Sequence, residues 1–204
     1  MCGIVGVLGS HEVAPVILNA LKRLEYRGYD SSGVATVHQG ALQCRRATGK
    51  LINLQDLLIR EPLRGFAGIG HTRWATHAAP SVENAHPHCS GSIAVVQNGI
   101  IENFRELRTE LSAAGAQFNS KTDTETIIHL TNKHLADGMP PAQASHATLG
   151  RLEGAFAFLF LLEGEEDLLI AARRVSATNH TALAATNVPM PVAMFSRCLR
   201  YWVN

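Results

Sequence analysis

A cysteine at the second position is the residue of this sequence with the clearest potential for chemistry. The chain begins MCGIVGVLG, so removal of the initiating methionine leaves a thiol and a free α-amino group on Cys2. A thiolate is a strong nucleophile, and an α-amino group with a pKa of about 7.7–8.0 accepts a proton near neutral pH. Cys2 therefore has the groups for both the nucleophile and the base of a covalent mechanism. The alternative is that Cys2 is a small buried hydrophobic residue with a structural role.

Three further stretches combine glycine with polar side chains. They are RGYDSSG (27–33), GHTRWATHAAPSVENAHPH (70–88) and QNGIIEN (97–103). The first is also compatible with a simple turn after a helix, because glycine and aspartate favour turns. Asn98 and Gly99 between apolar residues are also typical of a hairpin turn.

The histidines of the second stretch could instead bind zinc, with a cysteine as an additional soft ligand. The residues concerned are His71, His77, His86, His88 and Cys89. Their spacing contains neither a helical HExxH motif nor a paired Cys/His knuckle, so zinc is the weaker interpretation. No metal and no organic cofactor is expected.

The elements that must position these residues follow from the apolar pattern. Runs of consecutive apolar residues predict strands covered on both faces, at 3–8, 32–37, 66–72, 92–97, 155–162 and 167–172. Apolar stripes predict helices over 12–26, ended by a left-handed cap at Gly28, and over 103–114, ended at Gly115.

A third helix begins at TDTE, where Thr122 and Glu125 suit a capping box, and ends at Gly138. Pro140 and Pro141 open a shorter fourth helix. The order of the elements predicts a layered α+β domain.

Composition excludes several classes of protein. The 204 residues are 46% hydrophobic, and 18 basic against 17 acidic residues give a net charge of +1. Neither nucleic acid nor a membrane surface is expected as a partner. The four cysteines form no CxxC pair, which favours a reducing compartment. The longest apolar run, 155–162, is far shorter than the roughly twenty residues of a spanning helix, so a cytoplasmic protein is expected.

Taken together, the motifs resemble the glutaminase domain of the N-terminal-nucleophile amidotransferases, and within them the glutamine:fructose-6-phosphate aminotransferase family. LEYRGYDSSG, HTRWATH, NAHPH, NGIIEN and TDTE stand in that family's order and spacing. The resemblance implies a four-layer αββα sandwich with two antiparallel sheets between two helix layers. It also implies hydrolysis of glutamine to glutamate and ammonia for the synthesis of glucosamine 6-phosphate.

The resemblance assigns catalytic roles to three residues. Cys2 is the nucleophile, while the side-chain amide of Asn98 and the backbone N–H of Gly99 stabilise the oxyanion. Arg27, in the RGYDS element, supports the site without reacting.

The resemblance also assigns the contacts to glutamine. Arg73 binds the α-carboxylate of glutamine, and Asp123 binds its α-ammonium group. The alternative for Asp123 is an acidic residue that stabilises the N-terminus of a helix and binds no ligand. Trp74, Thr76 and His77 lie on a loop that closes over the substrate.

The sequence departs from the family pattern at three places. Gln97 stands where histidine is expected before Asn-Gly, and Ala78 where glycine is expected. Residues 175–204 match no part of the family's continuation, so the matched glutaminase domain is expected to cover 2–174 and to be incomplete.

The resemblance places fructose 6-phosphate in isomerase domains that this sequence lacks. Because the matched glutaminase domain is expected to lack its final strands, which would leave an unpaired sheet edge, weak glutaminase activity or none is expected of this chain. An inactive glutamine-binding or regulatory fragment remains the alternative function.

Overall fold

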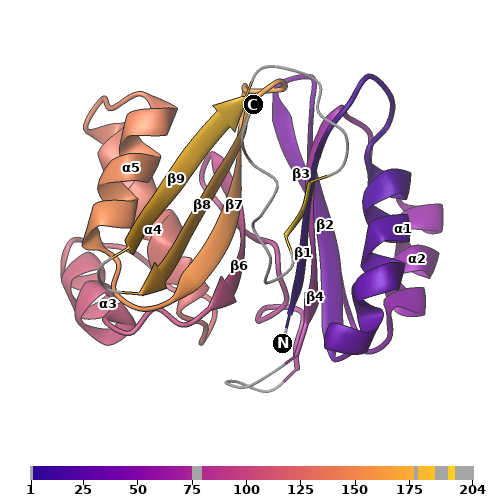
Figure 1. The fold of residues 1–204 in the computed structure, drawn as a ribbon, viewed down its shortest axis with the longest axis horizontal. Helices are drawn as coiled ribbons and strands as arrows, with labels where there is room; N and C mark the ends of the chain where they lie inside the picture. Colours follow the sequence, from indigo (N-terminus) through magenta and orange to yellow (C-terminus); the bar gives the residue numbers. More distant parts are fainter. Residues whose placement is uncertain (1, 75–79, 177–178, 187–192, 196–204) are drawn as a thin grey trace.

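Two antiparallel sheets lie face to face between two layers of helices (Figure 1). The computed structural model describes residues 2–74, 80–176, 179–186 and 193–195. This four-layer arrangement confirms the fold predicted from the sequence. The sandwich positions the functional residues because several of its strands end at the same end of the molecule.

The first sheet has the strand order β10-β1-β4-β2-β3. Its strands are β1 (Gly3–Leu8), β2 (Ser31–His38), β3 (Ala41–Thr48), β4 (Ala67–Arg73) and β10 (Ala193–Phe195). The helices α1 (Ala14–Leu24) and α2 (Leu51–Arg60) cover its outer face, and a 3-10 turn (Glu25–Arg27) follows α1 (Figure 1).

The second sheet has the order β5-β6-β7-β8-β9. Its strands are β5 (His88–Ser90), β6 (Ile93–Gly99), β7 (Phe156–Leu162), β8 (Leu169–Ser176) and β9 (Asn179–Thr186). The helices α3 (Phe104–Ala113), α4 (Thr124–Ala136) and α5 (Pro141–Arg151) cover its outer face (Figure 1).

Three apolar clusters hold the layers together. One joins α1 and α2 to the first sheet, one joins α3–α5 to the second sheet, and the third fills the space between the sheets. Ile4 and Ile69 of the first sheet meet Val96 and Leu159 of the second in this central cluster. Burial of both sheet faces explains why the strands read as continuous apolar runs.

The six predicted strands and the four predicted helices are present, with shifted ends. Two details of the first helix were wrong. Val16 belongs to the predicted apolar stripe but is 38% exposed. Gly28 is extended, with φ −173°, and is no left-handed cap. A Cβ at Gly28 would overlap the backbone of Arg73 and Trp74, so close approach of two segments is what requires glycine there.

The predicted capping box before α4 was also wrong. Thr122 does not cap this helix, because its hydroxyl lies 2.9 Å from Nε2 of His88. The carboxylate of Glu125 accepts hydrogen bonds from the backbone N–H groups of Asn119 at 2.8 Å and Ser120 at 2.7 Å. Glu125 therefore orders the segment before the helix.

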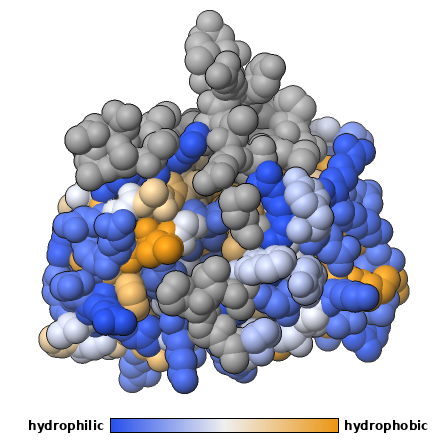
Figure 2. Space-filling view, turned by 60° about the horizontal axis from the view of Figure 1, so that its bottom comes forward, coloured by the Kyte–Doolittle hydropathy of each residue, from blue (hydrophilic) through white to orange (hydrophobic). Residues whose placement is uncertain are grey.

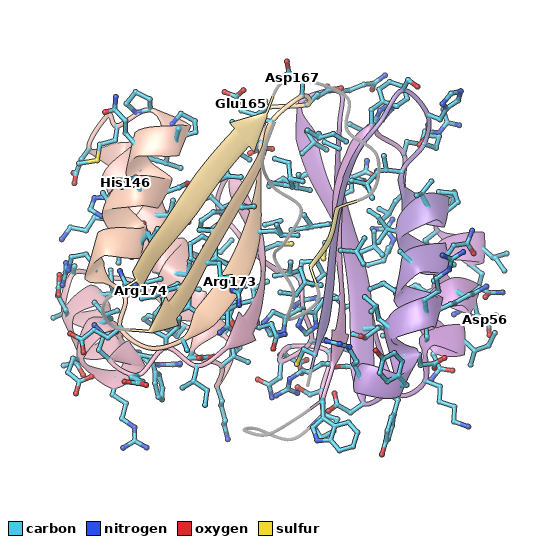
Figure 3. All side chains as sticks on the ribbon, in the orientation of Figure 1. Asp56, His146, Glu165, Asp167, Arg173 and Arg174 are labelled. Atoms are coloured by element: carbon cyan, nitrogen blue, oxygen red, sulfur yellow. The ribbon has the colours of Figure 1, made fainter. Side chains whose placement is uncertain are left out.

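The chain beyond Arg174 supplies two edge strands, since β9 pairs with β8 and β10 pairs with β1. Arg174 itself is buried and donates to the carbonyl oxygens of Leu149 and Leu152, at the end of α5 (Figure 3). Pro189 and Pro191, whose residue type disfavours a central strand in the segment after Arg174, lie outside the described residues. The domain boundary at residue 174 stays a prediction. Among the described residues, no helix is long and apolar enough to cross a membrane.

Candidate active site

One pocket of about 310 Å³ gathers most of the residues predicted to act on a substrate. It is lined by Cys2 just before β1, by Arg73 at the end of β4 and Trp74 directly after it, and by Asn98 and Gly99 at the end of β6. Asp123, before α4, lines it too. Figure 2 brings forward the end of the sandwich at which the N-terminus lies, where the described surface is mostly hydrophilic with small, separate hydrophobic areas.

Cys2 is held by the backbone that follows β4. Its Sγ lies 3.9 Å from the carbonyl oxygen of Trp74 and accepts from the N–H of the same residue at 3.5 Å. Burial raises the pKa of the Cys2 thiol, whereas the hydrogen bond from Trp74 and the charge of Arg73 lower it and only partly offset burial. The thiol therefore needs a base to become the thiolate.

The end of β6 brings an amide beside this cysteine. Nδ2 of Asn98 donates to the carbonyl oxygen of Cys2 at 3.1 Å. Gly99 has φ +124°, and a Cβ there would overlap the carbonyl oxygen of Ala155 and the backbone of Phe156. Because residues with a Cβ rarely adopt this conformation, Gly99 is required by the backbone geometry. The strand does not make the hairpin turn that Asn98 and Gly99 alone would predict, since α3 follows.

Arg73 combines a buried position with access to the pocket. It ends β4, and the residue is only 5% exposed. Trp74 is 43% exposed and packs edge-to-face on Tyr29, with ring centroids 5.2 Å apart. Arg73 therefore places a permanent positive charge in the pocket wall, next to an aromatic residue at its rim.

Asp123 provides a negative charge on another wall of the pocket. It is the residue immediately before α4, and its Oδ2 accepts from the backbone N–H of Ile101 at 2.8 Å. This hydrogen bond fixes the carboxylate between the β6–α3 connection and α4. The described lining of the pocket thus includes two cationic side chains, Arg73 and Lys121, and the anionic side chain of Asp123, which suits a ligand that carries both charges.

Three other predicted residues are not among the described residues that line the pocket. Thr76 and His77 are outside the described residues. Arg27 is not among the pocket-lining residues, and its Nε donates to the hydroxyl of Tyr26 at 3.0 Å. The structure connects the segment that follows Arg27 to the site through the close packing of Gly28 on Arg73 and the ring contact of Tyr29 with Trp74.

Behind the pocket lies a buried polar network that contains Gln97. His71 Nε2 lies 3.0 Å from the carbonyl oxygen of Gln97, so this nitrogen carries the proton and donates. The hydroxyl of Thr124 donates to Gln97 Oε1 at 3.1 Å and must therefore accept from His86 Nε2 at 2.9 Å. These hydrogen bonds hold Gln97, the residue directly before Asn98, through both its backbone carbonyl and its side chain.

A second branch of the network ends on a carboxylate. The hydroxyl of Ser120 donates to Glu125 at 2.7 Å, so Thr122 donates to Ser120 and accepts from His88. Burial raises the pKa of Glu125, but hydrogen bonds from His129, Asn119 and Ser120 outweigh this effect and lower it to about 2. Glu125 is therefore the ionised end of the branch.

The three histidines of the network are neutral at pH 7. Burial lowers the pKa of His71 to about 3 and that of His88 to about 4, and it lowers the pKa of His86 well below its ordinary value. The rings of His71 and His86 stack with centroids 4.3 Å apart, and His88 meets His86 edge-on at 4.6 Å.

The zinc alternative is not supported by the part of the chain that the structure describes, which holds no group of three or more His, Cys, Asp and Glu residues suited to a metal ion. His77, one of the proposed ligands, lies outside that part. His71, His86 and His88 use their Nε2 atoms in hydrogen bonds to protein oxygens.

Sequence reasoning missed several lining residues of the pocket. His86, Gln97, Phe104, Lys121 and Thr122 all contribute to its walls. Lys121 and Thr122 directly precede Asp123, so a search around the predicted acidic residue would have found them. Phe104 belongs to the predicted apolar stripe of the helix at 103–114, but no pattern in the sequence indicates that it lines a pocket.

Comparison with protein families gives one match. The family described as a glutamine amidotransferase domain matches residues 71–182, which is more than half of the chain.

Among curated proteins, the chain is similar to the glutamine–fructose-6-phosphate aminotransferase (isomerizing) of Mesorhizobium japonicum, with 60% identity over 173 residues. The protein of that name from Brucella abortus is 57% identical over 174 residues. Each match covers 85% of this chain, but only 28% and 29% of the relative. The chain thus spans less than a third of the length of these relatives.

Two solved structures are also similar. Glutamine phosphoribosylpyrophosphate amidotransferase from B. subtilis has a TM-score of 0.73 and 27% identity, with 84% of this chain and 37% of that chain covered. A glutamine aminotransferase class-II domain protein from Silicibacter pomeroyi has a TM-score of 0.59 and 18% identity, with 89% and 80% covered. The second likeness concerns the fold alone.

Proposed function

The chain belongs to the family of glutamine amidotransferase domains, and we propose that it hydrolyses the side-chain amide of glutamine to glutamate and ammonia. One observation carries this proposal. Cys2, Asn98, Arg73 and Asp123, which lie far apart in the sequence, line a single pocket. A thiol, an amide donor, a cation and an anion are the groups that attack on an amino acid's side-chain amide requires.

The thiolate of Cys2 attacks the amide carbon, with the α-amino group of Cys2 as the base that takes the thiol proton. Because burial raises the pKa of this thiol, the base is needed for attack at neutral pH. Protonation of the leaving nitrogen releases ammonia and leaves a γ-glutamyl thioester. Water then attacks the thioester, forms glutamate and regenerates the thiol. This role requires that Met1 is removed, because an acylated nitrogen is not basic.

Asn98 and Gly99 stabilise the oxyanion of the tetrahedral intermediate. One hydrogen of Asn98 Nδ2 is used by the carbonyl oxygen of Cys2. An amide NH₂ group has a second hydrogen, which is available for a substrate oxygen held next to Cys2. The backbone N–H of Gly99 is proposed as the other donor.

Arg73 and Asp123 hold the two charges of the glutamine main chain. A guanidinium binds a carboxylate with two parallel hydrogen bonds, so Arg73 is assigned to the α-carboxylate. Asp123, fixed by the N–H of Ile101, is assigned to the α-ammonium group. Trp74, Thr76 and His77 complete the proposed binding loop, and Arg27 supports it through the turn that packs on Arg73.

The released ammonia is proposed to reach fructose 6-phosphate and to form glucosamine 6-phosphate. This acceptor is suggested by the name of relatives that are 60% and 57% identical to the chain. Since the chain covers 28–29% of these relatives, we place the sugar-phosphate site in a part of the protein beyond the 204 residues of this chain.

The direct test is the formation of glutamate and ammonia from glutamine by the purified chain. Equal amounts of both products are expected, with none from Cys2→Ala. Cys2→Ala should still bind glutamine in a calorimetric titration. Binding by the unmodified chain without any hydrolysis would support the alternative of a regulatory glutamine-binding fragment, and hydrolysis by Cys2→Ala would overturn the proposed nucleophile.

A further inference from the structure

Two cysteines remote from the pocket meet at one edge of the sandwich. Cys44 lies on β3 and Cys89 on β5, which are edge strands of the two facing sheets. Both sulfur atoms contact the carbonyl oxygen of Pro87, Cys44 at 3.7 Å and Cys89 at 4.0 Å. The two thiols also interact with each other, and this interaction shifts the pKa of both.

The strand registers explain why these side chains face one another. Cys44 pairs with Ala35 of β2, and Cys89 pairs with Ala94 of β6. Both alanines belong to the apolar cluster between the sheets, and directly paired residues of neighbouring strands project to the same face. The cysteines therefore project into the space between the sheets at its open edge.

Access and charge make the pair reactive. Cys89 is exposed and Cys44 is half-buried, so a small oxidant can reach the thiols. The interaction with Cys89 lowers the pKa of the Cys44 thiol, and Arg46 and Arg45 lower it further despite burial. The same interaction, together with burial, raises the pKa of the Cys89 thiol. A thiol with a lowered pKa beside a second thiol is the arrangement of an attacking and a resolving cysteine.

We propose that Cys44 and Cys89 form a redox-active pair that a hydroperoxide converts into a disulfide joining the two sheets. The thiolate of Cys44 attacks the peroxide oxygen and breaks the O–O bond, which gives a sulfenic acid and releases hydroxide or an alkoxide. The sulfur of Cys89 then attacks the sulfenic sulfur, and the S–O bond breaks with release of water. Overall, two thiols are oxidised to one disulfide and one peroxide is reduced to two hydroxyl compounds.

The disulfide would fasten a segment that continues into the pocket. Pro87 and Cys89 are separated by His88, which hydrogen-bonds to Thr122, while the neighbouring His86 lines the pocket. Arg46, two residues after Cys44, also donates to the carbonyl oxygen of Ala85 at 3.3 Å. The pair is thus connected to the pocket wall through consecutive residues of one segment, although its oxidation does not depend on glutamine hydrolysis.

The test is oxidation of the folded, reduced chain by hydrogen peroxide, followed by digestion with trypsin without reductant. The expected product is a linked pair of peptides, residues 28–45 with residues 74–105, which reductant separates. Oxidation without this link, or a link through Cys2 or Cys198 in its place, would overturn the proposal. The oxidised chain should also melt roughly 5–15 °C higher than the reduced chain, because the disulfide restricts the unfolded state. If the cross-link lowers the melting temperature, the disulfide does not fit the geometry of the folded sandwich.

Two matched variants separate the roles of the two thiols. Cys44→Ser and Cys89→Ser should each abolish the linked peptides and the rise in melting temperature. In Cys89→Ser, serine keeps a hydroxyl donor beside Cys44, so a dimedone adduct should form on Cys44. It should form faster than the adduct on Cys89 in Cys44→Ser. The reverse order of labelling would overturn Cys44 as the attacking thiol.

Discussion

The side chain of Asn98 donates a hydrogen bond to the backbone of Cys2 across 96 positions of sequence, at a distance of 3.1 Å. Cys2 precedes the first strand of one sheet and Asn98 lies on β6 of the other. The packing of the two sheets against each other therefore sets the distance between the proposed nucleophile and the proposed oxyanion donor.

Loss of the Asn98 amide should reduce turnover far more than binding. Asn98→Ala is expected to lower kcat about 100- to 1000-fold, because the donor acts on charge that develops in the transition state. Steady-state kinetics with glutamine measure the effect. Gln117→Ala, which removes an exposed amide, is the matched control and should leave kcat unchanged. A normal kcat in Asn98→Ala would remove this residue from the oxyanion site.

Arg73→Ala should chiefly weaken the binding of glutamine. A hydrogen bond to a charged group contributes about 1.5–3 kcal/mol, so the dissociation constant should rise roughly 10- to 150-fold for each bond lost. Titration of glutamine into Cys2→Ala, with and without Arg73→Ala, measures binding in the absence of turnover. Arg60→Ala, at an exposed position of α2, is the control. If the affinity stays the same, Arg73 does not bind the α-carboxylate.

Gly99→Ala and Gly150→Ala should have opposite effects on stability. Gly99 has a positive φ and no room for a Cβ, so alanine should cost about 1–3 kcal/mol in the free energy of unfolding. Gly150 lies within α5 with no atom near the position of a Cβ, so alanine should stabilise by about 0.5–1 kcal/mol. Urea unfolding compares the two. Equal effects would contradict the backbone requirement at Gly99.

Stability should fall as the pH drops below about 6.5. His71, His86 and His88 have lowered pKa values in the folded chain, so below the ordinary pKa of histidine the unfolded chain binds more protons. The free energy of unfolding then decreases toward acid pH by about 1 kcal/mol per pH unit for each histidine. The stabilisation is complete above pH 6.5 and is lost progressively toward pH 4 and below.

Urea unfolding at several pH values tests this dependence. His88→Gln should reduce the slope between pH 6 and pH 5, whereas His146→Gln should leave it unchanged, since His146 lies exposed on α5 (Figure 3). An unchanged slope in His88→Gln would mean that His88 is not held neutral by the fold.

The fold could be predicted largely because its sheets are covered on both faces. β1, β4 and β7 are buried along almost their whole length, so they appear as apolar runs. β3 was missed because this edge strand is only half-buried and has the mixed sequence ALQCRRAT. α2 was missed although Leu51 and Leu54 are buried, because the exposed Ile52 and Ile59 blur its apolar stripe.

The site was predictable only where motifs carry chemistry. Cys2, Arg73, Asn98, Gly99 and Asp123 stood out by type and by family resemblance, and the pocket brings them together. The network of His71, His86 and His88 could not be foreseen, because its members come from β4, a connection and β5 and meet only after the sheets pack. From the sequence alone, these histidines could also be interpreted as zinc ligands.

The most direct test of the account is the reaction of the chain with a diazoketone analogue of glutamine, an electrophile that alkylates a thiolate. Intact mass and peptide mapping should show one adduct per chain, located at Cys2, and an excess of glutamine should slow its formation. Arg73→Ala should slow labelling, while Arg60→Ala should not. Absence of an adduct at Cys2, or labelling that glutamine does not slow, would contradict the proposal that Cys2 attacks glutamine bound in this pocket.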